Sequence, residues 1–157
     1  MCKFYAVDIF STPRLKDVTY YMRLDSDSLI LEPLCYDPFE VMYIRHRAYG
    51  YFGVGMDAVE ATQGMWPFVY KYAVTHPAVE KQLHGNKWEW PQERNAEGDM
   101  IGAFKGYFNN FEIVKLEEFR RPNVKHWLDE LVRYPEAFFK WRWGWSIFPQ
   151  RCGKSVF

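Results

Sequence analysis

Tryptophan recurs at every second position near the end of the chain, in the stretch FFKWRWGWSIF at residues 138–148. Successive side chains of an extended strand point to opposite faces, so the tryptophans would share one face, and Lys140 and Arg142 would lie on the other. An apolar face of this size has to pack against a second layer of structure. We therefore expect a strand whose tryptophans lie mainly in the core. The residues of that face are Phe139, Trp141, Trp143, Trp145 and Ile147.

The segment before this stretch predicts the covering layer. Between Arg121 and Tyr134 the apolar residues are spaced at i, i+3, i+4, i+7 and i+8, which is the stripe of an amphipathic helix. Pro135 follows the expected end of the helix. The sequence therefore predicts a helix packed next to the tryptophan strand. Its apolar residues are Val124, Trp127, Leu128, Leu131 and Val132.

Short runs rich in Val, Ile, Tyr and Phe predict strands in the first third of the chain, separated by residues that favour turns. Residues 48–55 predict a strand end or bulge, because three glycines fall in eight positions. Two further strands are expected near residues 100–107 and 111–116. The four early runs are residues 3–10, 17–24, 28–34 and 40–46.

Between these groups of strands, residues 56–63 and 65–85 predict short helices broken at Pro67 and Pro77. The expected fold class is therefore α+β, with a mostly antiparallel, curved sheet or open β-barrel of about five to seven strands and a few packed helices. A length of 157 residues fits one globular domain covering residues 1–157.

The charge balance and the cysteine content limit the classes of function that this chain can have. The 20 basic and 20 acidic residues cancel, so nucleic-acid binding would depend on a local basic patch. Cys2, Cys35 and Cys152 match neither a disulfide framework nor a zinc ligand set, which favours a reducing compartment. No run approaches the length of a membrane span, so we expect a cytoplasmic protein without a membrane partner.

Motifs for catalysis and cofactor binding are weak. The CGKS at residues 152–155 has no glycine at Phe148 and no room for a following helix, so it is not a phosphate-binding loop. The four histidines form no zinc-binding spacing. An enzyme that uses His84 with carboxylates of the polar segment 86–99 is the third-ranked hypothesis. We expect no cofactor and no metal.

Aromatic and basic residues alternate in several places, and aromatic residues make up 20% of the chain. Stacking of bases on aromatic rings, with Arg and Lys on phosphates, is how proteins bind single strands. We therefore expect a nonenzymatic module that binds RNA, DNA or a modified base. The expected binding residues are Arg45, Arg47, Tyr49, Trp66, Trp88, Trp90, Arg120, Arg121, Lys140 and Arg142.

Three segments resemble PUA-like domains of the EVE and ASCH type, which are small β-barrels with flanking helices. Residues 40–55 resemble a strand that leads into glycines, residues 98–107 resemble a second strand, and residues 111–135 followed by WSIFP resemble the closing strand, helix and strand. The resemblance implies a domain that recognises RNA or a modified base without catalysis.

An alternative from a different class is a protein that binds another protein, such as a small inhibitor or adaptor of a larger complex. Exposed Trp, Tyr and Arg are enriched in binding hot spots, and a net charge of zero suits a protein partner better than a polyanion. Convergence of the basic residues on one face would favour nucleic acid over a protein partner.

Overall fold

The computed structural model describes residues 2–85, 89–141 and 143. In this part of the chain no helix is both long and apolar enough to cross a membrane. The α-helices are α1 (Cys2–Ala6), α2 (Pro38–Ile44), α3 (Met65–Thr75), α4 (Pro77–Gly85), α5 (Leu116–Phe119), α6 (Pro122–Val132) and α7 (Glu136–Phe139). The strands are β1 (Tyr20–Leu24), β2 (Tyr49–Asp57) and β3 (Phe104–Lys115), and the 3-10 helices are η1 (Asp8–Ser11), η2 (Pro13–Leu15) and η3 (Val59–Thr62).

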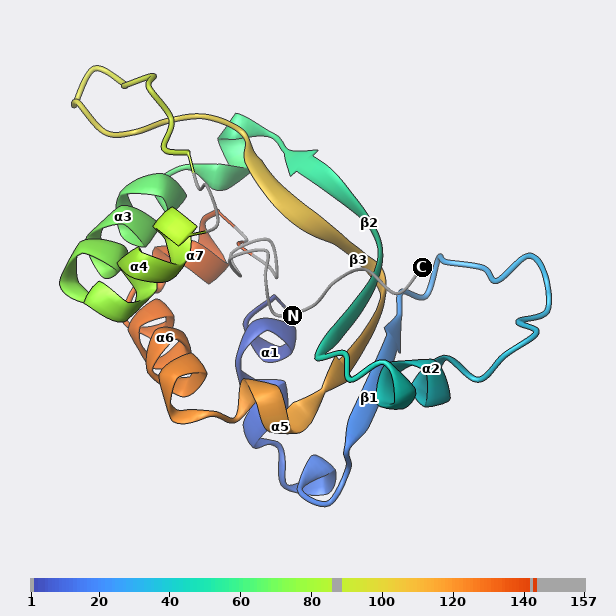
Figure 1. Cartoon of the computed structure of the whole chain (residues 1–157). Helices are drawn as coiled ribbons and strands as arrows, with labels where there is room; N and C mark the ends of the chain where they lie inside the picture. The colour runs from blue at the N-terminus through green and yellow to red at the C-terminus, as the bar shows by residue number, and fades with distance from the viewer. Residues whose placement is uncertain (1, 86–88, 142, 144–157) are drawn as a thin grey trace.

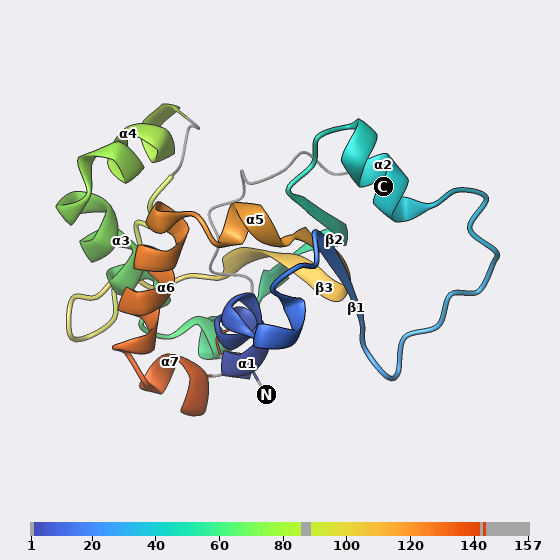
Figure 2. The same ribbon diagram turned by 90° about the horizontal axis from the view of Figure 1, so that it is seen from below.

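The helices α3, α4, α6 and α7 gather at one side of the molecule, and the sheet with α2 lies at the other (Figure 1). A view turned by 90° shows the same division, with α1 and α5 between the two groups (Figure 2). One hydrophobic core joins them, because buried residues of the sheet, α1, α3 and α6 belong to a single cluster. The strands and the helices therefore share one interior.

The described residues form a three-stranded antiparallel sheet in the order β1-β3-β2. The long strand β3 is central, and a bulge interrupts its pairing with β2 between Tyr51 and Gly53. Of the predicted fold, the α+β class and the antiparallel sheet are confirmed, and so is the irregularity expected among the glycines of residues 48–55. The expected five to seven strands are wrong for this part of the chain, because several strand-like runs form helices or loops.

Helix α6 agrees with most of its predicted stripe: Trp127, Leu128 and Leu131 are buried against the core, whereas Val132 is exposed. The break between α3 and α4 at Pro77 is confirmed. Pro67 causes no break, since it lies in the first turn of α3, where a missing backbone N–H removes no helical hydrogen bond. Gly64 precedes α3 with a φ of 72°, a conformation that favours glycine.

Two of the expected strands are helical. Residues 3–10 include most of α1 and most of η1, and most of residues 40–46 belong to α2. Asp37 caps α2 by accepting a hydrogen bond from the backbone N–H of Phe39 at 2.8 Å, and Pro38 occupies the first turn. An Asp-Pro pair of this kind is a helix-start signal. In α2 this signal outweighed the β propensity of Val41, Tyr43 and Ile44.

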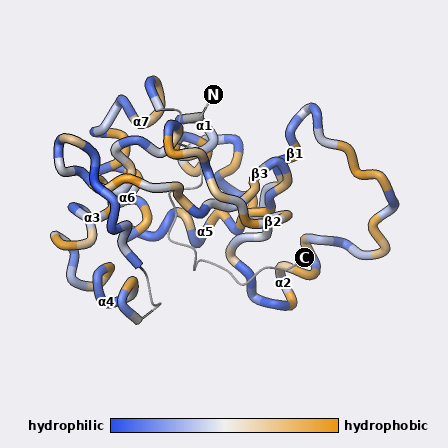
Figure 3. The backbone as a smooth tube through the Cα atoms, turned by 90° about the horizontal axis from the view of Figure 1, so that it is seen from above, coloured by the Kyte–Doolittle hydropathy of each residue, from blue (hydrophilic) through white to orange (hydrophobic). Residues whose placement is uncertain are grey.

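The expected strand at residues 28–34 lies in a loop that projects away from the body between β1 and α2 (Figure 1). Figure 3 shows apolar residues along this loop. Leu29 and Leu31 are 80% and 87% exposed. No described strand pairs with this run, so its β propensity has no ladder to join. The two strands expected at residues 100–107 and 111–116 are instead the single strand β3.

The tryptophan stretch does not begin as a strand. Residues Glu136–Phe139 form α7, and Phe138 of this helix is buried while Phe139 is 79% exposed. Trp143 is 1% exposed, so its expected place in the core is confirmed. Trp141 is only partly buried. Arg142, Trp145 and the rest of the predicted strand lie outside the described residues.

Candidate functional site

A carboxylate, Glu112, lies in the middle of one face of the sheet. It belongs to β3, and the strand register places Arg23 of β1 and Tyr51 of β2 opposite it on its two sides. Two residues further along β3, the same register brings Tyr21 of β1 and Tyr49 of β2 to either side. Residues two apart on a strand share a face, so these five side chains point to the same side of the sheet.

Glu112 accepts hydrogen bonds from both diagonal tyrosines. Tyr21 Oη donates to Oε1 at 3.1 Å, and Tyr49 Oη donates to Oε2 at 2.6 Å. The exposed fraction of Glu112 is 0% and that of Tyr49 is 2%, whereas Tyr21 is partly exposed. Glu112 therefore reaches solvent only through a neighbour, and of its two hydrogen-bond donors Tyr21 has the larger exposed surface.

Burial raises the pKa of Glu112 from its ordinary value of 4.5 to about 7, because the charged form is removed from water. The hydrogen bond from Tyr49, the charge of Arg23 and the hydrogen bond from Tyr21 each lower this pKa in part. Burial also raises the pKa of both tyrosines, so their hydroxyls stay protonated as donors. A carboxyl with a pKa near neutrality suits proton transfer, and a strongly shifted pKa often marks a functional site.

We expect the free energy of unfolding to fall as pH rises through the pKa of Glu112. The folded protein holds this proton more tightly than the unfolded chain, so the stabilisation is complete below about pH 4.5 and lost above about 7. Between pH 5 and pH 8 the loss should be about 2 to 3 kcal/mol. Urea denaturation at both pH values would measure it for the native chain and for Glu112→Gln, which lacks the titrating group. Equal pH dependence in both would contradict the assignment.

Three of the expected binding residues lie at the start of β2 and just before it. Tyr49 is part of the Glu112 cluster and buried, so it offers no surface for stacking. Arg45 is exposed at the end of α2. Arg47 is partly buried, and its Nε has no hydrogen-bond partner within the described part of the chain. These three residues are close together because they lie within five positions of one another in the sequence.

The expected tryptophans lie by the helices. Trp66 is buried, donates from Nε1 to the carbonyl of Gly102 at 3.0 Å and packs on Phe104. Trp90 is partly buried beside Trp66 and Tyr70. Trp66 and Trp90 are therefore packing residues in this arrangement. Trp88 lies outside the described residues.

The remaining cations do not converge either. Arg120 donates to three backbone carbonyls of the segment before β1, whereas Arg121 is exposed and pairs with Glu118 at 2.8 Å. Lys140 lies over the ring of Trp141, with its Nζ 4.5 Å from the ring centroid. Arg142 lies outside the described residues. Arg120, Arg121 and Lys140 therefore contact different groups, and a binding role for them stays a prediction.

His84, which sequence reasoning linked to loop carboxylates, lies 3.9 Å from Glu80 in a small depression that Tyr70 and Trp90 also line. Its volume of about 50 Å³ is well below the ~300 Å³ or more of ligand pockets. In the described ranges, no three His, Cys, Asp or Glu side chains come together to hold a metal ion. The Glu112 cluster is therefore the candidate site.

Sequence reasoning missed Glu112, although a signal was present. Glu112 is the one charged residue in the run Phe111–Val114, which was correctly placed in a strand. Strand alternation puts it on the same face as Val114, and buried carboxylates are rare unless they have partners. A lone carboxylate at a core position was therefore the available clue.

Comparison with known proteins identifies the family. The family model described as glycolipid 2-alpha-mannosyltransferase matches residues 1–152. An O-glycoside alpha-1,2-mannosyltransferase homolog of Schizosaccharomyces pombe is 25% identical over 144 residues, which cover 92% of this chain and 37% of that protein. The alpha-1,2 mannosyltransferase KTR1 of Saccharomyces cerevisiae is 26% identical over 152 residues, covering 92% and 35%. The chain thus spans little more than a third of the length of these relatives.

Solved structures agree in fold. The mannosyltransferase Ktr4p of Saccharomyces cerevisiae superimposes with a TM-score of 0.73 at 21% identity, covering 94% of this chain and 39% of that one. Core-mannan synthase A of Aspergillus fumigatus gives a TM-score of 0.70 at 22% identity, covering 94% and 40%. At these identities the likeness establishes the fold alone.

These matches correct the functional expectations from the sequence. The resemblance to PUA-like domains is wrong, because the family model covers the segments that suggested it. The nonenzymatic binding module, its RNA, DNA or modified-base ligand and the alternative inhibitor or adaptor are wrong as well, because the matched proteins are enzymes that transfer mannose. Short apolar strand motifs recur in many folds, so they had little power to separate families. The chain belongs to the glycolipid 2-alpha-mannosyltransferase family.

Proposed function

We propose that this chain takes part in mannosyl transfer from a GDP-linked donor to a hydroxyl group of a mannose-containing acceptor. The observation that carries the proposal is the family match over residues 1–152. A structure of Ktr4p is described as a complex with GDP, and the Schizosaccharomyces pombe relative as an O-glycoside alpha-1,2-mannosyltransferase homolog. GDP is the leaving group expected from GDP-mannose.

Glu112 acts in this proposal as the acceptor of the proton that the attacking hydroxyl must lose. A base works best with a pKa near the working pH, and burial raises the pKa of Glu112 to about 7. Glu112 has no exposed surface, so the proton reaches it through the partly exposed Tyr21. Tyr21 Oη accepts a proton from the attacking hydroxyl and passes its own to Glu112 Oε1 over 3.1 Å.

The Aspergillus fumigatus structure is described as a Mn/GDP form. In the described residues no three His, Cys, Asp or Glu side chains converge, so a manganese ion would be held by fewer side chains together with the phosphates of the nucleotide. The proton transfer proposed above is assigned to Tyr21 and Glu112 alone.

An assay of GDP release from GDP-mannose, with methyl α-mannoside as acceptor and mass spectrometry of the product, tests the proposal. We expect acceptor-dependent release of GDP by the native chain, and a turnover about 100-fold or more lower for Glu112→Gln. Tyr21→Phe should lower turnover about tenfold or more, because the path to Glu112 is broken.

Tyr49→Phe is the matched control. It removes a hydrogen bond to the same carboxyl from a tyrosine that is 2% exposed and outside the proposed proton path. Turnover of Tyr49→Phe should therefore stay closer to the native value than that of Tyr21→Phe. Equal losses in the two variants would contradict the relay, and a chain that neither binds GDP nor forms product would contradict the function.

Two sequence expectations remain predictions beside this function: that residues 1–157 form one domain, and that the protein is cytoplasmic. Limited proteolysis would test the first, since one domain should give no stable smaller fragment. Imaging of the tagged protein in its own cell would test the second.

A further inference from the structure

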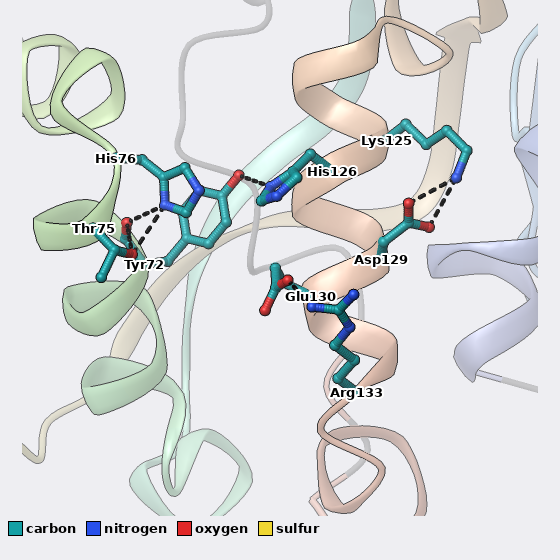
Figure 4. Close-up of polar contacts among 8 residues, drawn as sticks. All are labelled: Tyr72, Thr75, His76, Lys125, His126, Asp129, Glu130 and Arg133. Carbon is teal, nitrogen blue, oxygen red and sulfur yellow. Dashed lines mark hydrogen bonds and ion pairs between the residues drawn. The ribbon is translucent and has the colours of Figure 1, made fainter.

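A cluster of aromatic and imidazole rings joins α3 to α6 and shares no residue with the Glu112 cluster. Tyr72 lies in the last turns of α3, His76 follows directly after that helix, and His126 projects from α6. Figure 4 shows these side chains meeting between the two helices. The centroids of the two imidazole rings are 5.0 Å apart. Two histidines are thus brought together by helices that are fifty residues apart in the chain.

Hydrogen bonding defines which nitrogen of His76 is free. Its Nδ1 lies 2.8 Å from the backbone carbonyl oxygen of Tyr72, and a carbonyl can only accept, so Nδ1 carries a hydrogen. In the neutral ring, Nε2 then has a free lone pair. The ring is stacked on that of Tyr72 at 4.0 Å and 14°, with Nδ1 toward the backbone end of this residue. Nε2, on the other side of the imidazole, therefore points toward the hydroxyl end, where His126 lies.

His126 is held in a similar way. Its Nδ1 is 3.0 Å from the hydroxyl oxygen of Tyr72, which can accept a hydrogen bond from Nδ1 and leave Nε2 as the basic nitrogen. Histidines that bind metal ions usually donate their other ring N–H to an oxygen, which fixes the tautomer and the ring orientation. Both histidines of this cluster have such an oxygen at Nδ1.

The ring spacing fits one shared ion. Imidazole nitrogens lie about 2.0–2.1 Å from a tetrahedral Zn²⁺, which places the centroids of two ligating rings about 5 Å apart. The observed separation of the two imidazole centroids is 5.0 Å. The two imidazole rings are therefore already at the separation that a bridging ion needs.

The charges around the cluster also suit a cation. Glu130 lies one turn after His126 on α6, and its charge reaches the cluster, because after burial it is the other cause of the raised pKa of Tyr72. Lys125 precedes His126 on α6. Its Nζ forms an ion pair with Oδ2 of Asp129 at 2.7 Å (Figure 4). Arg133 is paired with Glu130 on the same helix and offsets part of its negative charge.

We propose that Nε2 of His76 and Nε2 of His126 together bind one first-row divalent transition-metal ion of the zinc type, with water completing the coordination. Imidazole is a preferred ligand of Zn²⁺, Cu²⁺ and Ni²⁺, whereas Mn²⁺ prefers oxygen ligands. The ion bridges α3 and α6 and stabilises their contact. The site uses none of the residues assigned to mannosyl transfer and does not depend on that function.

Calorimetric titration of the untagged chain with Zn²⁺ and Cu²⁺ tests the proposal. We expect one ion per chain, and at least a tenfold lower affinity in both His76→Ala and His126→Ala. His84→Ala is the matched control, because this exposed histidine belongs to another helix, α4, where it lies 3.9 Å from Glu80. Its affinity should stay within twofold of the native value. Unchanged affinity in either cluster variant would overturn the site.

Electron paramagnetic resonance of the Cu²⁺ form gives a second readout that does not depend on affinity alone. The native spectrum should show coupling to two imidazole nitrogens, and His76→Gln or His126→Gln should show coupling to one. These glutamine variants keep a polar side chain if alanine prevents folding, which circular dichroism would reveal. A native spectrum that shows coupling to one imidazole nitrogen or to none would overturn the two-histidine site.

Discussion

Replacing Glu112 with alanine is expected to lower the free energy of unfolding by about 2 to 5 kcal/mol at pH 5. The carboxyl is fully buried and accepts hydrogen bonds from Tyr21 and Tyr49. Each buried hydroxyl left without a partner costs about 1 to 3 kcal/mol, and the space left by the side chain adds to this cost. Chemical denaturation followed by tryptophan fluorescence would measure the change.

The size of this loss should depend on pH. At pH 5 the carboxyl is protonated, because its pKa is about 7, so the native protein carries no penalty for a buried charge. At pH 8 the buried carboxyl is largely charged, which destabilises the native protein. Glu112→Ala should therefore lower the free energy of unfolding by less at pH 8 than at pH 5. Glu112→Gln keeps an oxygen that can accept a hydrogen bond from one tyrosine. At pH 5 it should therefore lower the free energy of unfolding by less than Glu112→Ala does. A loss below about 1 kcal/mol at pH 5 would contradict the described hydrogen bonds.

Arg120→Ala should be the second strongly destabilising change, with a loss of about 2 to 4 kcal/mol. The guanidinium of Arg120 donates to three backbone carbonyls, those of Phe10 at 2.9 Å, Leu15 at 2.7 Å and Lys16 at 3.2 Å. These bonds connect the end of α5 to a segment more than a hundred residues earlier. Their loss leaves partly buried carbonyl oxygens without a charged donor, which thermal or urea denaturation would detect.

Arg121→Ala is the control for this change, because it removes the same side chain from the next position. Arg121 is exposed, and its ion pair with Glu118 should contribute about 1 kcal/mol or less. Arg120→Lys keeps the charge but loses the planar arrangement of donors. Its free energy of unfolding should therefore lie between those of the native protein and Arg120→Ala. Similar losses for Arg120→Ala and Arg121→Ala would mean that the three carbonyl bonds do not stabilise the fold.

The two arginines illustrate how far sequence reasoning reached. Both were expected to bind phosphate, since a cation beside an aromatic residue looks the same in the sequence whether it points outward or inward. The tertiary structure separates them, because the turn after α5 directs Arg120 at the carbonyls of the η1–η2 segment and leaves Arg121 exposed. The residues next to an arginine in the sequence do not tell whether its side chain points toward a distant part of the backbone or toward solvent.

The tryptophan stretch shows a different limit. Alternation of apolar residues predicted a strand, but Pro135 and the burial of Ala137 and Phe138 start a helical turn there instead. The expected core position of Trp143 was nevertheless confirmed, because burial follows from hydrophobic area whatever the local backbone. Hydrophobicity thus predicted the environment of this side chain better than its secondary structure.

The sequence by itself determined the elements whose signals are local. A 3.6-residue stripe specified α6, Pro77 separated α3 from α4, and glycines marked the irregular part of β2. Local spacing also sufficed for the α+β class. These features depend on residues that are neighbours along the chain, so the sequence contains the information needed to predict them.

Only the tertiary structure decided where Glu112 and the paired histidines lie. The pairing of β1 and β2 with β3 brings Tyr21 and Tyr49 to the carboxyl from positions 91 and 63 residues away. The packing of α3 on α6 brings His126 to Tyr72 over 54 residues. Sites of this kind are built from strand register and helix contact, and these are set by the burial of the whole core rather than by any one segment.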